Sequence, residues 1–200
     1  MPDLFPDLKA RAICAYHDAE VARPRSQRHA AEGPWHFVAQ NHDANRELWD
    51  QEDQARRIDV ADADIVGNKR AIDRLNQARN DAIERLDEAL LERLAAIAPM
   101  HDAWHNSETA GSMIDRLSIL SLKLFHMGAE AARAGASSDH TARCREKGML
   151  VSIAGASVAL SGNLPYLPAS STSAAGSPGM PADQGPFSDL SGSRLPSLSR

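Results

Sequence analysis

The sequence predicts an all-α protein, an up-and-down helical bundle followed by a disordered C-terminal tail. Apolar residues recur three and four positions apart over long segments, which is the spacing of one helix face. No segment shows the strict apolar–polar alternation of a half-buried strand. Ser, Gly and Pro dominate the chain from Ser161 onward, and such a segment buries too little apolar surface to offset the entropy of ordering it.

The composition fits one domain plus a tail. The chain has 200 residues, of which 42% are hydrophobic and 24% charged, as in ordinary globular proteins. The net charge of −5 argues against a nucleic-acid partner. No apolar run approaches the roughly 20 residues that cross a bilayer. Residues 1–7 contain acids and prolines and do not resemble a signal peptide, so we expect a cytoplasmic protein without a membrane span.

The N-terminal part, residues 1–34, is predicted to be irregular apart from one short helix. Small and apolar residues share one face over residues 8–21, which favours a helix there. The Gly33-Pro34 pair then marks the boundary of the segment, because both residues interrupt regular structure.

The bundle domain is predicted over residues 35–147, where the apolar periodicity is strongest. A helix is expected over residues 35–57. The longest helix is expected over residues 65–98, because Pro99 pushes the preceding residue out of helical geometry. The apolar positions of that helix are Ile65, Ile72, Leu75, Ile83, Leu86, Leu90, Leu94 and Ile97.

Two further helices are predicted after a loop. The first covers residues 112–134, and Gly135 is its expected C-cap, since glycine adopts the left-handed conformation found there. The second covers residues 138–147 and is expected to stop at Gly148. The remaining low-complexity segment, residues 148–200, is the predicted disordered tail.

A polar line runs along the 35–57 helix. Asn45, Trp49, Glu52 and Arg56 lie close to one line at about 100° per residue. One interpretation is a solvated face on which Glu52 and Arg56 form an (i, i+4) ion pair. The other turns Trp49 inward and takes Glu52 with it into a polar pocket.

Arg79 falls on the apolar line of the 65–98 helix, where an aliphatic residue is expected. A buried arginine must be paired, because an unpaired buried charge is strongly destabilising. Glu52, Glu84 and Asp115 are its available partners. The alternative is an arginine whose guanidinium reaches solvent at the edge of the bundle. The polar stripe beside it consists of Asp73, Asn76, Asn80, Glu84 and Asp87.

Paired carboxylates on the helices favour a different chemistry. Glu84 and Asp87 share one helix face, as do Glu47 and Asp50. Hard cations such as Mg²⁺ take oxygen ligands from such pairs, although the pattern is common by chance in charged helices. The alternative function is therefore a Mg-dependent hydrolase of nucleotides or nucleotide sugars. A separate hint of a metal is the set His101, His105 and Glu108.

The start of the 112–134 helix combines capping residues with charge. Arg116, Lys123 and His126 lie within reach of one face, and Asp115 stands beside Arg116. An arginine and a lysine near a capped helix start suit a phosphate or carboxylate ligand. Ordinary ion pairing between helices is the alternative.

Three segments, residues 45–56, 69–87 and 106–127, resemble in this order an uncharacterised bacterial family of the DUF4254 type, a domain of unknown function. The resemblance extends over about residues 30–147. It implies an all-α fold and no established activity. The resemblance also implies an association with glycosyltransferases, of which members of this family look like frequent genomic companions.

The end of the chain departs from this family. Relatives continue after the segment matching Arg145 with another long charged helix, whereas here a Ser, Pro, Gly and Ala stretch follows Gly148. We expect a replaced C-terminus, with one bundle helix missing and apolar surface of its partners exposed.

The predicted function is binding of a small anionic or sugar-like metabolite, or of a partner protein, in a polar pocket between helices. A link to glycosyltransferase or cell-envelope polysaccharide pathways is expected. The arginines would engage anionic groups, and the glutamates would accept hydroxyls. No cofactor is expected; Mg belongs to the alternative, with Glu84 and Asp87 as ligands. A purely structural stripe that fixes helix register is the third interpretation. The predicted ligand-binding residues are Glu52, Arg56, Arg79, Asn80, Glu84, Asp115 and Arg116.

Overall fold

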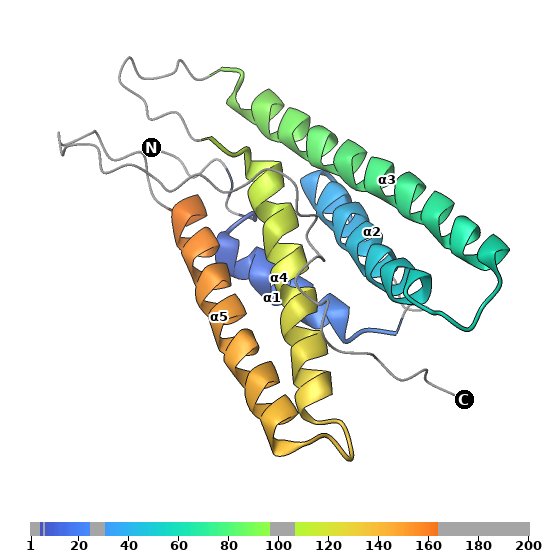
Figure 1. Cartoon of the computed structure of the whole chain (residues 1–200). Helices are drawn as coiled ribbons and strands as arrows, with labels where there is room; N and C mark the ends of the chain where they lie inside the picture. Colours follow the sequence, from blue (N-terminus) through green and yellow to red (C-terminus); the bar gives the residue numbers. More distant parts are fainter. Residues whose placement is uncertain (1–4, 6, 25–30, 97–106, 164–200) are drawn as a thin grey trace. The chain divides into compact units, whose positions relative to one another are not determined.

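A computed structural model describes residues 5, 7–24, 31–96 and 107–163 of the chain. These residues all belong to a unit spanning 1–169; a second unit, 170–200, lies outside the described residues. The described part is helical and contains no strand, which confirms the predicted all-α class (Figure 1). Its helices are α1 (Ala10–Val21), α2 (Pro34–Ala55), α3 (Asp62–Leu94), α4 (Ala110–Ala131) and α5 (Ser138–Asn163).

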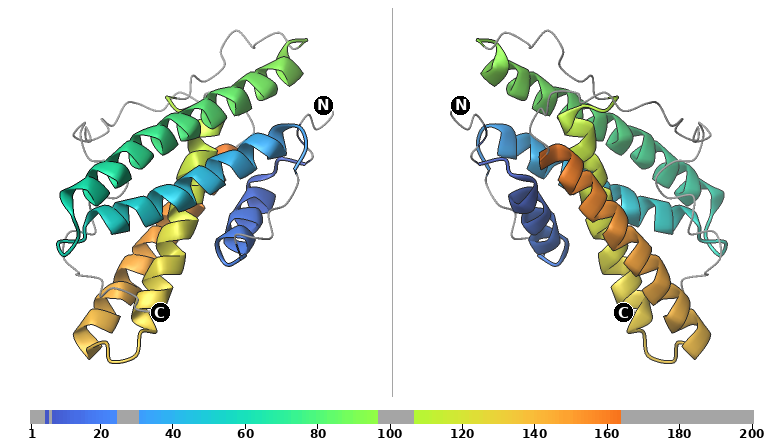
Figure 2. Two further views of the ribbon diagram at one scale, coloured as in Figure 1. Left: turned by 90° about the vertical axis from the view of Figure 1, so that its right-hand side faces the viewer. Right: turned by 90° about the vertical axis from the view of Figure 1, so that its left-hand side faces the viewer.

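The helices form two hairpins, and the short helix α1 packs against the second of them. α2 packs along α3, and α4 packs along α5. The hairpins cross in the side views of Figure 2, where α4 and α2 run at an angle to one another. α1 lies against α4 and α5. Among the described residues, no helix has both the length and the apolar character that crossing a membrane would require.

The core lies where four helices meet. Ile13 of α1, Val38 of α2, Leu86 of α3, and Ile114 and Leu117 of α4 form one cluster of buried residues, with exposures between 0% and 7%. Val158 of α5 packs against the edge of this cluster. Every helix therefore contributes apolar surface to one core, and this burial is the main force that holds the helices together.

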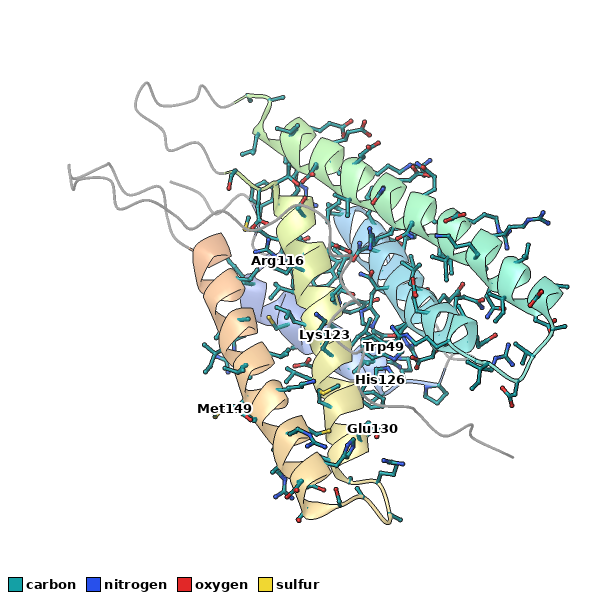
Figure 3. The ribbon with its side chains drawn as sticks, in the orientation of Figure 1. Trp49, Arg116, Lys123, His126, Glu130 and Met149 are labelled. Atoms are coloured by element: carbon teal, nitrogen blue, oxygen red, sulfur yellow. The ribbon has the colours of Figure 1, made fainter. Side chains whose placement is uncertain are left out.

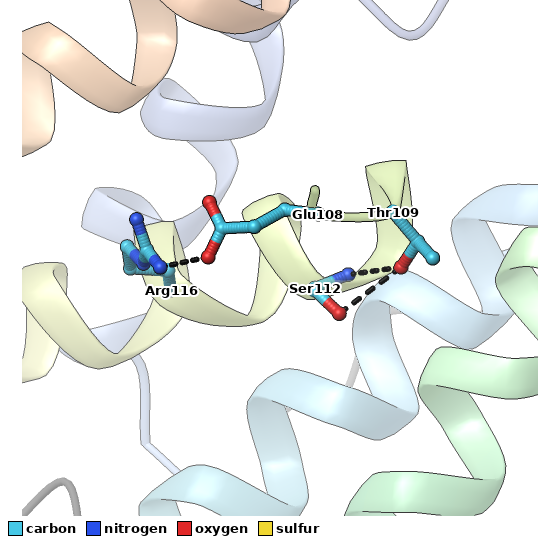
Figure 4. A network of polar contacts seen from close by, with 4 residues as sticks. All are labelled: Glu108, Thr109, Ser112 and Arg116. Atoms are coloured by element: carbon cyan, nitrogen blue, oxygen red, sulfur yellow. Dashed lines mark hydrogen bonds and ion pairs between the residues drawn. The ribbon is translucent and has the colours of Figure 1, made fainter. Parts of the chain in front are cut away.

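The N-terminus of α4 approaches α3 closely. A Cβ atom on Gly111 would lie 2.8 Å from the backbone oxygen of Ile83, so only glycine fits there. The backbone N–H of Gly111 donates to Asp87 Oδ1 at 2.7 Å, and Thr109 caps the helix by accepting from Ser112 N at 3.1 Å (Figure 4). Such caps stabilise a helix by about 1 kcal/mol.

The prediction that the last helix stops at Gly148 was wrong. α5 continues through Gly148 and Gly155 to Asn163, because its small residues allow close packing on α4. A Cβ on Gly148 would lie 3.9 Å from Met127 Cβ, and one on Gly155 would lie 3.8 Å from Leu120. Tertiary packing thus outweighs the low helix propensity of glycine. The predicted disorder of the tail beyond residue 163 lies outside the described residues.

Two smaller expectations also changed. α3 begins at Asp62 and not near Ile65, with two acids in its first turn, where they favour a helix start. Gly135 does not cap α4, whose C-cap is Ala132; it lies in the following turn with a φ of 78°. Pro99, the predicted stop of the long helix, lies outside the described residues.

Candidate functional site

The residues predicted to form one pocket are spread over several surfaces. Asn80 and Glu84 are exposed on α3, and Arg56 is exposed at the end of α2. Arg56 Nη1 pairs with Asp53 Oδ1 at 3.1 Å, an (i, i+3) pair on the same helix, and not with Glu52. Glu52 is half-buried.

Arg79 is half-buried on the inner face of α3. Its Nε is sheltered from solvent and has no hydrogen-bond partner in the part of the chain that the structure describes. Within that part, no ion pair joins it to Glu52, Glu84 or Asp115, its expected partners. A sheltered donor without an acceptor is destabilising, so this guanidinium has unused capacity for a hydrogen bond.

The charges at the start of α4 serve different purposes. Asp115 turns inward and accepts hydrogen bonds from Asn41 Nδ2 and Asn45 Nδ2, each at 2.8 Å. Arg116 turns outward and pairs with Glu108 (Figure 4). The arrangement matches ion pairing at a helix start more closely than an open anion site.

Trp49 points inward, as one interpretation of the polar line proposed, and is 4% exposed. Its ring stacks on His126 of α4, with 4.2 Å between the centroids and 6° between the planes. Burial lowers the pKa of His126, against the opposing charges of Asp50 and Glu130. Along α4, Arg116, Lys123 and His126 follow one another toward the C-terminal end (Figure 3), so the stacked His126 is separated from Arg116.

The paired acids of α3 differ in their surroundings. Asp87 is half-buried and accepts from the backbone of Gly111, whereas Glu84 is exposed. Across the described residues, His, Cys, Asp and Glu side chains form no group of three or more that could hold a metal ion. His101 and His105 lie outside those residues.

A chain of uncharged polar groups crosses the centre of the molecule; we call it the polar seam, and it consists of His17, Asn41, His42, Asn45 and Ser118. Ser118 and Asn45 are 0% exposed, and Asn45 Nδ2 donates to Ser118 Oγ at 3.2 Å. His42 Nδ1 lies 2.9 Å from Ser118 Oγ and 3.1 Å from His17 Nδ1. The seam thereby ties α1 and α2 to α4, and its two asparagine amides also donate to the carboxylate of Asp115 outside it.

Sequence analysis did not find most of the polar seam. Asn45 was recognised as polar on an apolar helix, but His17, Asn41, His42 and Ser118 were not singled out. The sequence does contain a pattern that indicates part of the seam, because Asn41 and Asn45 are one helical turn apart among buried positions. A polar pair at core spacing predicts a buried partner.

A groove lies between α2 and α3; we call it the α2–α3 groove. Its volume is about 330 Å³. Alanines form its floor, since Ala44 and Ala82 are 6% and 2% exposed. The lining residues are Gln40, Asp43, Ala44, Glu47, Leu75, Ala78, Asp81, Ala82 and Arg85.

The walls of the α2–α3 groove carry more negative than positive charge. Asp43 and Glu47 come from α2, and Asp81 and Arg85 come from α3. Asp81 Oδ1 also accepts from Gln77 Nε2 at 2.7 Å, which orients the carboxylate. Three carboxylates and one guanidinium give a site rich in hydrogen-bond acceptors. None of these charged residues was among the predicted site residues, since surface acids on helices carry no distinctive sequence signal.

Comparison with known proteins identifies a family whose function is unknown. The family model described as "Protein of unknown function (DUF4254)" matches residues 35–157. No curated protein and no solved structure matches the chain. The match confirms the resemblance seen in the sequence and extends past Gly148 into the second half of α5.

Proposed function

We propose that this chain, which belongs to the DUF4254 family of proteins of unknown function, binds a small sugar-like molecule in the α2–α3 groove. The observation that supports this most strongly is the groove itself, a hollow of about 330 Å³ with polar walls and an apolar floor. That volume is at the lower end of the range for small-molecule sites.

The charges of the groove favour a polyhydroxylated ligand over an anionic one. Asp43, Glu47 and Asp81 accept hydrogen bonds from hydroxyl or ammonium groups, and they repel phosphate and carboxylate groups. Arg85 and Gln40 add donors for ring or hydroxyl oxygens. Of the anionic metabolite, the sugar-like metabolite and the partner protein that the sequence predicted, we therefore propose the sugar-like metabolite, neutral or amino-substituted.

Arg79 is a neighbour of groove residues along α3, although it does not itself line the groove. It follows Ala78 and lies between Leu75 and Ala82 at helical spacing, and all three of these residues line the groove. Its Nε has no partner among the described residues. Because that nitrogen is sheltered, we propose no ligand contact for it, and Arg79 remains a neighbour of the proposed site.

A sugar-like ligand fits the expected link to glycosyltransferase or cell-envelope polysaccharide pathways, which we retain as part of the proposal. The Mg-dependent hydrolase gains no support from the geometry. Asp87 is already bound to the N-terminus of α4, and Glu84 points to solvent.

Isothermal titration with glucose, glucosamine and glucose 1-phosphate tests the proposal, with Asp81→Asn and Glu84→Gln as a matched pair. Both substitutions remove one carboxylate charge from α3, but only Asp81 lines the groove. Asp81→Asn should weaken binding of glucosamine by about tenfold, the loss of one charged hydrogen bond, whereas Glu84→Gln should leave binding unchanged.

Preference for the phosphorylated sugar would contradict the proposed ligand class. Equal losses in the two variants would show that the carboxylates act only through long-range charge. A loss in Glu84→Gln alone would move the site to the outer face of α3.

A further inference from the structure

Two histidines are sealed together in the interior. The rings of His17 and His42 stack with 4.9 Å between centroids and 28° between planes. The two side chains are 0% and 1% exposed. Their Nδ1 atoms are 3.1 Å apart, and neither Nε2 has a hydrogen-bond partner in the described part of the chain.

This geometry accommodates neutral rings. A neutral imidazole has one N–H and one bare nitrogen, so the two Nδ1 atoms can share a single hydrogen bond. A protonated ring carries two N–H groups, and burial away from water disfavours the added charge. Two protonated rings would also place like charges at stacking distance.

The surrounding groups do not compensate such a charge. From α1, Tyr16 presents its ring edge-on to both histidines, at 5.6 Å and 6.2 Å between centroids. From α2, the positive charge of Arg46 adds to burial, the larger effect, and together they lower the pKa of His42 to about 4. Burial and then the charge of His42 lower the pKa of His17, against a backbone hydrogen bond with Ile114.

Three carboxylates of α1 and α4, Asp18, Glu20 and Asp115, are engaged in other contacts. Asp115 of α4 accepts from two asparagine amides, and Asp18 of α1 accepts from Ser121 Oγ at 2.7 Å. Glu20 of α1 pairs with Arg23 at 2.7 Å. From α5, the residue that packs at the edge of the core is the apolar Val158.

We infer that the stacked pair His17 and His42 is an acid-sensitive latch that holds α1 against α2 and α4, and that protonation of the pair releases α1. The pair is well placed for this role because it joins α1 to α2 directly and to α4 through Ser118. The inference does not depend on the function proposed for the α2–α3 groove.

The sign of the effect follows from proton linkage. The released state binds protons at the ordinary histidine pKa of about 6.5, while the closed state resists them. The latch is therefore at full strength above pH 6.5, and it weakens as the pH falls from there toward 4, the pKa region of the buried His42. The equilibrium constant for release should rise about tenfold per pH unit for one imidazole, and up to about a hundredfold for two.

Hydrogen exchange of the full chain, read by mass spectrometry between about pH 7.5 and 5, measures this release. After correction for the intrinsic exchange rate at each pH, peptides of α1 should lose protection steeply below about pH 6.5 while peptides of α3 keep it. His17→Phe should reduce the slope to that of one imidazole. His36→Gln, which removes an exposed histidine of α2, should leave the slope unchanged.

Loss of protection by α1 and α3 together, with one common pH dependence, would overturn the inference. An unchanged slope in His17→Phe would do the same. If that variant does not fold, histidine ¹³C NMR of the unchanged chain decides. The resonances of the pair should shift only where α1 exchange accelerates, and titration near pH 6.5 with α1 still protected would contradict the latch.

Discussion

The polar seam and the α2–α3 groove both use polar side chains of α2, yet their chemistry differs. The seam contains amides, imidazoles and a hydroxyl, and its central members are between 0% and 1% exposed. The groove contains carboxylates and a guanidinium above an alanine floor. Burial accounts for the difference, because a sealed site tolerates neutral groups that bond to one another, while full charges need water or a ligand.

The polar seam and the α2–α3 groove have different roles: the seam holds the helices together, and the groove is the proposed ligand site. Seam atoms hydrogen-bond to each other; for example, Asn45 Nδ2 donates to Ser118 Oγ. These bonds fix the packing of α2 against α4. Groove residues stand beside a hollow that a ligand can enter. Substitutions in the seam should therefore change stability, and substitutions in the groove should change binding.

The largest effect is expected from Asn45→Leu. It removes the amide that donates to Asp115 and Ser118, which leaves a carboxylate and a hydroxyl without this donor in the interior. We expect a loss of about 3 kcal/mol in the free energy of unfolding, measured by urea denaturation. The matched control is Asn80→Leu on the exposed surface of α3, which should change stability by less than about 0.5 kcal/mol. Equal effects would remove the distinction between seam and surface.

A smaller effect, on binding alone, is expected from Ala78→Leu. Ala78 lines the groove and is exposed, so a leucine fills the hollow without disturbing the core. Affinity for the amino sugar should fall by at least about tenfold, which is about 1.4 kcal/mol. The control is Ala63→Leu, at an exposed position in the first turn of α3, which should bind normally. Retained affinity in Ala78→Leu, measured by titration calorimetry, would place the ligand elsewhere.

Sequence periodicity predicted the order of the long helices and the inner face of α3, because Ile72 and Leu86 are buried where apolar spacing placed them. It did not predict which polar groups meet. His17 and His42 belong to different helices, and spacing within one helix does not report contacts between helices. This is the main reason the seam was missed.

The predicted site differs from the groove for a related reason. Glu84 and Arg56 stood out by charge, but both face solvent, whereas the groove exists because Ala44, Ala78 and Ala82 are small. Alanine is common on every helix face and gives no sign of a hollow before the packing is known. The apolar spacing of α3 did single out Arg79, which is half-buried with a sheltered Nε, but Arg79 does not line the groove.

The most direct test of the central claim, that the α2–α3 groove is the ligand site, is an NMR titration of the chain with glucosamine. The claim predicts that backbone amide shifts change at Ala44, Ala78 and Ala82 along the groove, while those of Ser118 in the seam and Arg116 at the start of α4 stay constant. Shifts confined to Arg116 and Lys123, or shifts with glucose 1-phosphate and none with glucosamine, would contradict it.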